Sequence, residues 1–396
     1  MRRKSDQNKA TISHNQKVPT EGDFPLNRDA VGGVTSYSPF RGVGGSSIRL
    51  PAEWEPQSFV QLTWPHAGTD WADMLDEVSE CFVGIAREIV KRERLLIVCA
   101  DENSVREQLR DLPQNKITYV QIPSNDTWAR DHGGITVMED GKPVVLDFTF
   151  NGWGMKFPAN LDNQITRQLF EKNIFPENVK YHNRLNFVLE GGSIESDGQG
   201  TILTTAECLL SENRNNLSKE EIEAKLKEYL GAERILWLHH GYLAGDDTDS
   251  HVDTLARFCS PDTIAYVKCD DENDEHYSEL KKMEEEIFSF APLGVGGIPL
   301  PMADAVYDEN GDRLPATYAN FLIINDAVLM PTYNSPKDEI ARGQLQKAFP
   351  DREIIGIDCL ALIKQHGSLH CVTMQYGASP NPSKGGEFGG HDLKSL

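Results

Sequence analysis

The sequence lacks several features that would assign it to familiar classes of protein. It has no run of about 18 apolar residues, so no segment is long enough to span a membrane as a helix. Its basic first sixteen residues contain no apolar stretch and do not match a secretory signal. The seven cysteines are odd in number and include no Cys-x-x-Cys pair, which argues against a disulfide framework or a zinc finger. We therefore expect a cytoplasmic protein.

Positive charge is also scarce. The chain carries 39 Lys and Arg against 61 Asp and Glu, a formal net charge of -22. An anionic surface disfavours nucleic acid and anionic membranes as partners, and it attracts small cations. The length of 396 residues is enough for a large core in one or two domains.

The two ends of the chain differ from its middle. Residues 1–47 are polar and rich in Gly, Ser and Asn without periodicity, which predicts a disordered N-terminal tail. Residues 379–396 carry Pro, Gly and Ser, and we expect a flexible C-terminal tail there. The remaining residues, 48–378, are predicted to form a single domain.

Within that domain one unit recurs, in which a polar motif leads into two strands joined by a tight turn. The turns fall near residues 141, 198, 261 and 325, a repeat of roughly 60 residues. A first unit around 53–82 and a closing segment make five units plausible. Amphipathic or capped helices are expected at 71–92, 220–230 and 339–349. The pattern predicts an α/β fold, a five-bladed pseudo-symmetric α/β propeller with its helices outside.

The polar motifs occupy the same place in each unit. The residues that precede or open the first hairpin strand are Asp131, Glu190, His251 with Asp253, Asn320 and Cys371. If the units are arranged in a ring, equivalent positions meet at one end of the axis. Residues scattered over the chain would then share one pocket.

The residue types in this set suit one chemical task. Two carboxylates, Asp131 and Asp253, can grip a planar guanidinium through paired hydrogen bonds. The guanidinium carbon is a poor electrophile, so the thiolate of Cys371 is a reasonable nucleophile. His251 can protonate the leaving nitrogen and then deprotonate water, and Glu190 can fix the orientation of His251.

Simpler interpretations compete with this one. Asp131 could pair with Arg130 on the surface, the Glu190 motif could be an ordinary turn, and Cys371 could be a buried structural thiol. The stretch 245–253 is rich in oxygen ligands plus one His, although zinc hydrolases typically supply two or three His. The acidic run 270–275 reads as a solvated helix N-terminus, since it lacks the spacing of a calcium loop.

The chain resembles the agmatine deiminase family, a branch of the guanidino-group-modifying enzymes that also includes the bacterial peptidylarginine deiminases. The resemblance runs from Pro51 to Gln375. The segments that carry it are Asp126-Thr127-Trp128-Ala129-Arg130-Asp131, Leu189-Glu190-Gly191-Gly192-Ser193, Asn213-Arg214-Asn215, Gly245-Asp246-Asp247-Thr248-Asp249, His251-Val252-Asp253 and His370-Cys371. The family fold of five α/β blades, the pentein type, agrees with the repeat.

The resemblance implies a reaction and a role for each matching position. Agmatine and water would give N-carbamoylputrescine and ammonia through a covalent thiouronium on the cysteine, with no cofactor and no metal. By position, the nucleophile is Cys371, the general acid/base His251, its orienting carboxylate Glu190, and the guanidinium-binding pair Asp131 and Asp253. Trp128, Asp247 and Asn320 are expected to contact substrate. The expected partner is a small cationic guanidino compound, and nothing in the sequence fixes an oligomeric state.

The chain departs from the family pattern in two places. His366-Gly367-Ser368 stands where the family usually has Gly-Gly-Asn, and Asp247 and Ser250 replace a Glu and a Gly. A deiminase of free or peptidyl arginine is the alternative enzyme, since Lys156 could reach a carboxylate of such a substrate. A non-catalytic binder of cationic metabolites is the alternative outside the enzyme class.

Overall fold

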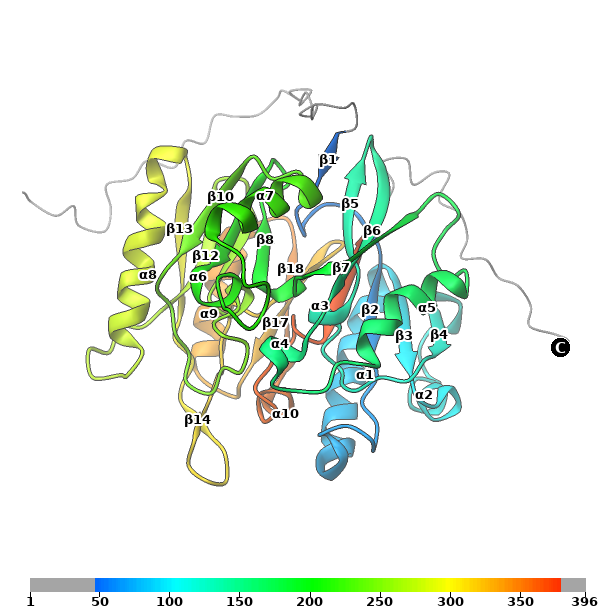
Figure 1. The fold of residues 1–396 in the computed structure, drawn as a ribbon. Helices are drawn as coiled ribbons and strands as arrows, with labels where there is room; N and C mark the ends of the chain where they lie inside the picture. Colours follow the sequence, from blue (N-terminus) through cyan, green and yellow to red (C-terminus); the bar gives the residue numbers. More distant parts are fainter. Residues whose placement is uncertain (1–46, 379–396) are drawn as a thin grey trace, which may run out of the picture. The chain divides into compact units, whose positions relative to one another are not determined.

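The computed structural model describes residues 47–378 (Figure 1). The predicted tails, 1–47 and 379–396, lie outside these residues except for Ser47, whose backbone N–H donates to Asp140 Oδ1. Among the described residues, no helix is both long and apolar enough to cross a membrane. All seven cysteines lie in this part of the chain, and all are free and buried, as the sequence predicted.

Five sheets share one arrangement of strands. In each, an antiparallel pair of strands is followed across the sheet by a third strand that runs parallel to the second strand of the pair, and in four of the five sheets the pair is a hairpin. Four of the five are consecutive along the chain: β5 (Ile135–Glu139), β6 (Lys142–Thr149) and β7 (Lys180–Val188); β8 (Ile194–Ser196), β9 (Thr201–Thr205) and β10 (Arg234–Leu238); β11 (Ala256–Ser260), β12 (Thr263–Lys268) and β13 (Gly296–Pro301); and β16 (Leu322–Ile324), β17 (Ala327–Thr332) and β18 (Glu353–Asp358). The four predicted hairpins and the predicted repeat are therefore confirmed.

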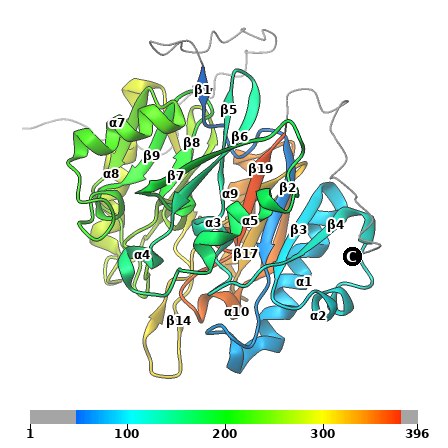
Figure 2. The same cartoon turned by 45° about the vertical axis from the view of Figure 1, so that its right-hand side comes forward.

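The fifth sheet joins the two ends of the described chain. Strand β19 (Thr373–Gly377) pairs antiparallel with β2 (Gln57–Thr63), which runs parallel to β3 (Arg94–Cys99) and is followed across the sheet by β4 (Ile117–Gln121). Figure 2 shows the last strand, in red, beside the first strands, in blue. Because β19 follows Cys371 directly, this pairing fixes the nucleophile segment to the start of the fold.

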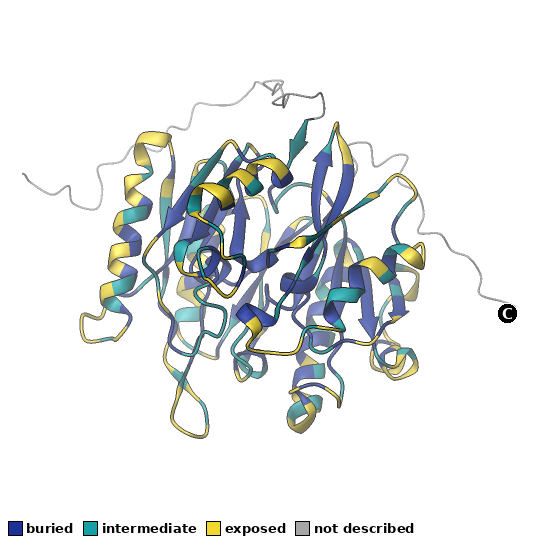
Figure 3. Ribbon diagram, in the orientation of Figure 1, coloured by how far each residue is buried: buried dark blue, intermediate teal, exposed yellow. Residues whose placement is uncertain are grey.

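A helix connects the two parallel strands of every sheet, as a parallel crossover requires. These helices are α1 (Leu75–Arg92), α5 (Ile165–Glu171), α7 (Lys219–Leu230), α8 (Tyr277–Ser289) and α9 (Lys337–Ala348). The three predicted helices are confirmed, and α7 has its predicted capping box, Ser218 with Glu221, and its predicted end at Gly231, whose φ is 70°. Figure 3 shows exposed residues on these helices and buried residues along the strands.

The remaining elements are short. They are β1 (Ile48–Arg49), which pairs with β5, the projecting hairpin β14 (Val306–Tyr307) and β15 (Arg313–Leu314), the helices α2 (Glu102–Gln108), α3 (Ala129–His132), α4 (Gly152–Met155), α6 (Ala206–Leu209) and α10 (Leu360–Ile363), and the 3-10 turns 72–74, 114–116, 162–164, 191–193, 252–254 and 291–293. Two of them, α3 and the turn 252–254, precede β5 and β11 and carry Asp131 and Asp253, and Glu190 directly precedes the turn 191–193 that leads into β8.

Candidate active site

The five segments that precede the first hairpin strands meet in the interior. Asp131, Glu190, Asp253, Asn320 and Cys371 each stand just before the first strand of a different sheet, and all five are buried. Hydrogen bonds and close contacts connect them across sequence separations of tens of residues. The convergence predicted from the repeat is therefore present.

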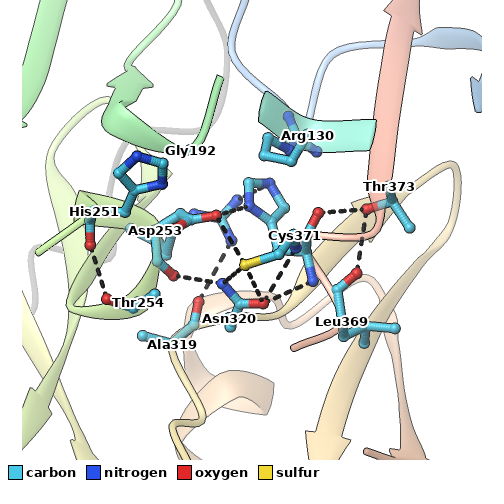
Figure 4. Close-up of polar contacts among 12 residues, drawn as sticks. Arg130, Gly192, His251, Asp253, Thr254, Ala319, Asn320, Leu369, Cys371 and Thr373 are labelled. Atoms are coloured by element: carbon cyan, nitrogen blue, oxygen red, sulfur yellow. Dashed lines mark hydrogen bonds and ion pairs between the residues drawn. The ribbon is translucent and has the colours of Figure 1, made fainter. Parts of the chain in front are cut away.

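Cys371 is held by the side chain of Asn320. The sulfur lies 3.2 Å from Asn320 Nδ2 and 3.8 Å from Asp253 Oδ2. Asn320 Oδ1 accepts from the backbone N–H of His370 at 2.9 Å and of Cys371 at 3.3 Å (Figure 4). Burial raises the pKa of the Cys371 thiol well above its usual range, and Asp253 and Asp131 raise it further. The thiol is thus neutral until something lowers its pKa.

His251 has one fixed and one unpaired nitrogen. Its Nε2 lies 3.2 Å from Glu190 Oε2, whereas Nδ1 has no hydrogen-bond partner and lies 3.6 Å from Asp131 Oδ1. Burial acts to lower the pKa of His251, but Asp131, Cys208 and Glu190 raise it well above the usual value. The raised pKa favours the imidazolium form of His251, whose Nδ1 faces Asp131 Oδ1.

Glu190 is held in turn by an arginine that sequence reasoning gave no role. Arg214 Nε donates to Glu190 Oε2 at 2.7 Å, and both side chains are inaccessible to solvent. Burial acts to raise the pKa of Glu190, but His251 and Arg214 bring it below the usual value. The same guanidinium donates to Asp249 Oδ2 at 2.7 Å and to the carbonyl of Thr248 at 2.8 Å. The only signal in the sequence was Asn213-Arg214-Asn215, a motif of the resemblance without a stated role.

Asp253 is positioned by His370, the residue before the nucleophile. Nδ1 of His370 donates to Asp253 Oδ2 at 2.7 Å, and Nε2 of His370 lies 2.8 Å from Glu53 Oε2. Arg257 donates to Glu53 at 2.7 Å and also pairs with Glu195. Burial acts to raise the pKa of Asp253, but the His370 contact and other nearby charges lower it overall. Asp253 is thus a carboxylate, with Oδ1 unpaired.

The carboxylate of Asp131 is held by two donors. Its Oδ2 accepts from Trp153 Nε1 at 3.0 Å, and its Oδ1 accepts from the backbone N–H of Gly192 at 3.0 Å. Burial raises the pKa of Asp131 to about 6, and the charge of His251 opposes that rise. Trp153 was not among the predicted site residues, although it lies three residues before Lys156, the residue considered above for an arginine carboxylate.

A cavity of about 180 Å³ leads to Cys371 and Asp131. Its lining residues are Asp70, Asp126, Trp128, Asp131, Trp153, Phe157, Asp247, Thr248, Gln365, His366, Gly367 and Cys371. Trp128 and Asp247 thus line the cavity, as a substrate contact requires. Asn320 was also predicted to contact substrate, but the structure places it beside the Cys371 sulfur, fully buried and outside the cavity lining.

Two of the departures from the family pattern, His366 and Asp247, line this cavity, whereas Ser368 and Ser250 do not. His366 has a left-handed φ of 65°, its Nδ1 lies 2.7 Å from the carbonyl of Gly245, and it is 4.0 Å from Asp247 Oδ2. At Gly367 a Cβ would lie 2.1 Å from the ring of Trp128, so the indole packs directly on this glycine. The substitutions at His366 and Asp247 therefore alter the entrance of the cavity, while Cys371 and its partners lie deeper.

Two groups of buried side chains have the residue types and spacing of a metal site. Glu190, Cys208 and His251 form one group, and Glu53, Glu195 and His370 form the other. Each already contacts an arginine: Arg214 pairs with Glu190, and Arg257 pairs with Glu53 and Glu195. A guanidinium neutralises these carboxylates and would repel a metal cation. The donor sets therefore do not fit a metal centre.

The assembled site suits a planar cation. A guanidinium placed between Asp131 and Asp253 would have its carbon near the Cys371 sulfur and a nitrogen near the Nδ1 proton of His251. Carboxylates, a thiol and an imidazolium in this arrangement can bind the cation, attack its carbon and protonate the departing nitrogen.

Comparisons with known proteins identify the family of this chain. Residues 49–377 match the family model described as Porphyromonas-type peptidyl-arginine deiminase. The chain is 35% identical over 354 residues to a putative agmatine deiminase of Enterococcus faecalis, covering 83% of this chain and 95% of the relative. It is 34% identical over 364 residues to an agmatine deiminase of Pseudomonas aeruginosa, covering 85% and 96%.

Solved structures show the same likeness. A putative arginine deiminase from Porphyromonas gingivalis is 57% identical with a TM-score of 0.80, covering 84% of this chain and 99% of that one. An agmatine deiminase of C. jejuni with substrate bound is 40% identical with a TM-score of 0.80, covering 85% and 98%. The mixed α/β fold is therefore the one found in agmatine deiminase structures. The chain belongs to the family of Porphyromonas-type peptidyl-arginine deiminases, which includes agmatine deiminases.

Proposed function

We propose that this protein is an agmatine deiminase that hydrolyses agmatine to N-carbamoylputrescine and ammonia. The observation that carries the proposal is the distribution of carboxylates along the cavity. Asp131 and Asp253 flank the nucleophile, and Asp70, Asp126 and Asp247 stand farther along the lining. Among the lining residues, all of which the structure describes, there is no Lys or Arg. Agmatine carries a guanidinium at one end and an ammonium at the other, and such a cavity matches both charges.

The first half of the reaction forms a covalent intermediate. The guanidinium binds between Asp131 and Asp253, and its charge offsets the two carboxylates that keep the pKa of Cys371 high. The Cys371 thiol releases its proton to solvent, and the thiolate attacks the guanidinium carbon and forms a neutral tetrahedral adduct. His251 donates its Nδ1 proton to one NH₂ group, the C–N bond breaks, and ammonia leaves. An S-alkylthiouronium remains on Cys371.

The second half releases the product. Neutral His251 takes a proton from water, and the hydroxide attacks the thiouronium carbon. The C–S bond of the second tetrahedral adduct breaks, the hydroxyl proton of the adduct passes to the departing Cys371 sulfur, and a ureido group forms. Glu190, through its contact with Nε2, keeps Nδ1 of His251 directed at the reacting atoms in both halves. No step uses a cofactor. Trp128 lines the cavity beside the bound guanidinium.

The same geometry disfavours free arginine. An arginine carboxylate would need a cation at the distal end of the cavity, and Lys156 was the candidate. Its Nζ instead donates to Asp249 Oδ1 at 2.6 Å and to the carbonyl of Asp247 at 2.7 Å. His366 is the remaining basic side chain at the rim, and it stands beside Asp247.

We infer further that the five sheets are the blades of a pseudo-symmetric α/β propeller. The shared strand order and the convergence of the five segments before the first strands support this arrangement. Small guanidino compounds are the expected partners, and the predicted cytoplasmic location is retained with this proposal.

The deciding experiment offers purified protein agmatine, free arginine and an arginyl peptide in parallel and measures ureido product. We expect turnover of agmatine and none in C371S. Turnover of arginine or the peptide in place of agmatine would establish the alternative substrate, and binding of agmatine without turnover would establish a non-catalytic binder. Undiminished turnover in C371S would contradict the covalent mechanism.

A second measurement tests the distal carboxylates. D247N is expected to raise the KM for agmatine by about threefold to tenfold at unchanged kcat, since a half-exposed charge pair is weak. D111N, which removes an exposed carboxylate outside the cavity lining, is the matched control. An unchanged KM in D247N would remove Asp247 from the ammonium contact.

A further inference from the structure

A chain of charged side chains runs from a surface loop to the imidazole of His251. Lys156 Nζ donates to Asp249 Oδ1 at 2.6 Å, and Asp249 Oδ2 accepts from Arg214 Nη1 at 2.7 Å. Arg214 Nε donates to Glu190 Oε2 at 2.7 Å, and that oxygen lies 3.2 Å from His251 Nε2. Both oxygens of Asp249 are therefore engaged, one by each cation.

The middle of this series of charged side chains is fully buried. The side chain of Arg214 is inaccessible to solvent, and the planar fork donates to three acceptors: Glu190, Asp249 and the carbonyl of Thr248. A guanidinium held at three points has little freedom to rotate. The orientation of Arg214, and hence of the Glu190 carboxylate, therefore depends on where Asp249 is held.

The loop 151–157 rests on this arginine. Four consecutive residues, 152–155, have a left-handed φ, and two of them are Trp153 and Met155 rather than glycine. Each non-glycine residue in that region costs about 1–2 kcal/mol, so contacts must hold the loop in place. Asn151 Nδ2 donates to the carbonyl of Asn213, and a Cβ at Gly154 would lie 3.8 Å from both Arg214 Nη1 and Asp249 Oδ2.

The loop also shapes the cavity. Trp153 and Phe157 line it, with ring centroids 5.5 Å apart, and Trp153 donates to Asp131. Lys156 lies between these two aromatic residues in sequence and contacts Asp249 and the carbonyl of Asp247, a residue that also lines the cavity. A displacement of the loop would therefore disturb the cavity wall and the Arg214 cluster together.

We propose that Lys156, Asp249 and Arg214 are positioning residues: Lys156 latches the loop 151–157 onto Asp249, and Asp249 with Arg214 holds the Glu190–His251 pair for proton transfer. The proposal rests on the proposed function, because its catalytic consequence concerns the guanidine hydrolysis at Cys371. Its structural consequence concerns access to the thiol and can be measured without turnover.

The first test uses iodoacetamide and measures alkylation of the Cys371 peptide by mass spectrometry at alkaline pH. Losing a half-exposed ion pair and a hydrogen bond to a carbonyl should open the loop more often, so K156M should speed alkylation about fivefold to tenfold. K156R should remain near the wild-type rate. K180M, which removes the half-exposed pair of Lys180 with Glu139 on β7, is the matched control and should have no effect.

The second test measures kcat and KM with whichever guanidine the wild-type protein hydrolyses. K156M should raise KM, D249N should lower kcat by about tenfold as Arg214 loses a charged partner, and K156R should restore wild-type values. In a double-mutant cycle, K156M should add little to D249N, because the latch acts through Asp249.

These outcomes separate the two proposals. If no guanidine is hydrolysed but K156M still accelerates alkylation, the proposed function fails and the latch stands. If K156M matches K180M in alkylation rate and in kinetic constants, the latch is wrong whatever the substrate. Additive effects of K156M and D249N on the alkylation rate would likewise contradict a path through Asp249.

Discussion

Gly192 offers the sharpest test of the site geometry. A Cβ added there would lie 2.6 Å from His251 Nδ1, 2.8 Å from Asp131 Oδ1 and 3.1 Å from Asp253 Oδ2. The three atoms that surround the expected guanidinium thus also surround this one missing methyl group. The φ of Gly192 is outside the left-handed region, so G192A meets no backbone strain, and the change removes no charge.

The expected cost can be worked from these distances. To regain a van der Waals separation of about 3.5 Å, the imidazole of His251 must retreat by about 1 Å. A displacement of that size in a reacting group lowers the rate by about 100-fold. Overpacking one methyl group costs about 1–3 kcal/mol of folding free energy, which a domain of this size tolerates. We therefore expect G192A to fold and to lose about two orders of magnitude in kcat.

The assay combines steady-state kinetics with chemical denaturation. The matched control is G84A in the middle of α1, where a Cβ would meet nothing within 4 Å. G84A should gain up to about 1 kcal/mol from helix propensity and keep its kcat. If G192A folds and retains the wild-type kcat, Nδ1 of His251 is not the atom that transfers the proton, and the assigned geometry is wrong.

Three further results are expected. The kcat/KM for agmatine should fall as pH drops through about 6, since protonation of Asp131 removes half of the guanidinium grip, and D131N should lack this limb. Folding raises the pKa of His251, so the stability that His251 contributes is complete below its unfolded pKa of about 6.5 and is lost as pH rises through its folded pKa. H251N should flatten this pH dependence of the unfolding free energy, measured by denaturation at neutral to alkaline pH. R257M should lower the unfolding free energy by about 3–5 kcal/mol, measured by urea denaturation, because it leaves Glu53 and Glu195 buried without their cation.

Local turn chemistry explains which parts of the fold could be predicted. Asp140-Gly141 and Asn325-Asp326 mark hairpins through residues that accept a positive φ, and their spacing gave the repeat. The third strands β7 and β13 left no comparable signal. Strand β13 contains two glycines and two prolines, which are tolerated because it lies at the edge of its sheet and pairs only with β12. Strand β7 is mostly polar for the same positional reason.

The residues of the site likewise divide into those that the sequence predicted and those that it did not. Residues that touch the reaction centre share a place in the repeat, so their sequence position alone predicted that they meet. Residues that hold them do not share it. Glu53 contacts His370 across almost the whole described chain, and Arg214 reaches Glu190 from the end of α6. Such contacts depend on how separate sheets pack, and a single sequence carries no signal for that.

Unpaired atoms around Cys371 link stability to catalysis. His251 Nδ1, Asp253 Oδ1 and Glu190 Oε1 are buried without a hydrogen-bond partner, while the other polar atoms of these side chains are firmly held. Each unmade bond costs about 1–3 kcal/mol in the free protein. A guanidinium supplies the donors that Asp253 Oδ1 lacks and receives the proton of Nδ1 as ammonia departs.

The positive charge of the substrate also affects the protonation of Cys371. Burial, reinforced by Asp253 and Asp131, raises the pKa of the Cys371 thiol in the free protein, and in the proposed complex a bound guanidinium would offset the two carboxylates. The thiol therefore loses its proton when the guanidinium is bound and keeps it otherwise. The protonated form protects a buried cysteine from oxidation and alkylation. A thiol with an ordinary pKa would react without substrate, so the two carboxylates serve both to recognise the cation and to delay the nucleophile until the cation has bound.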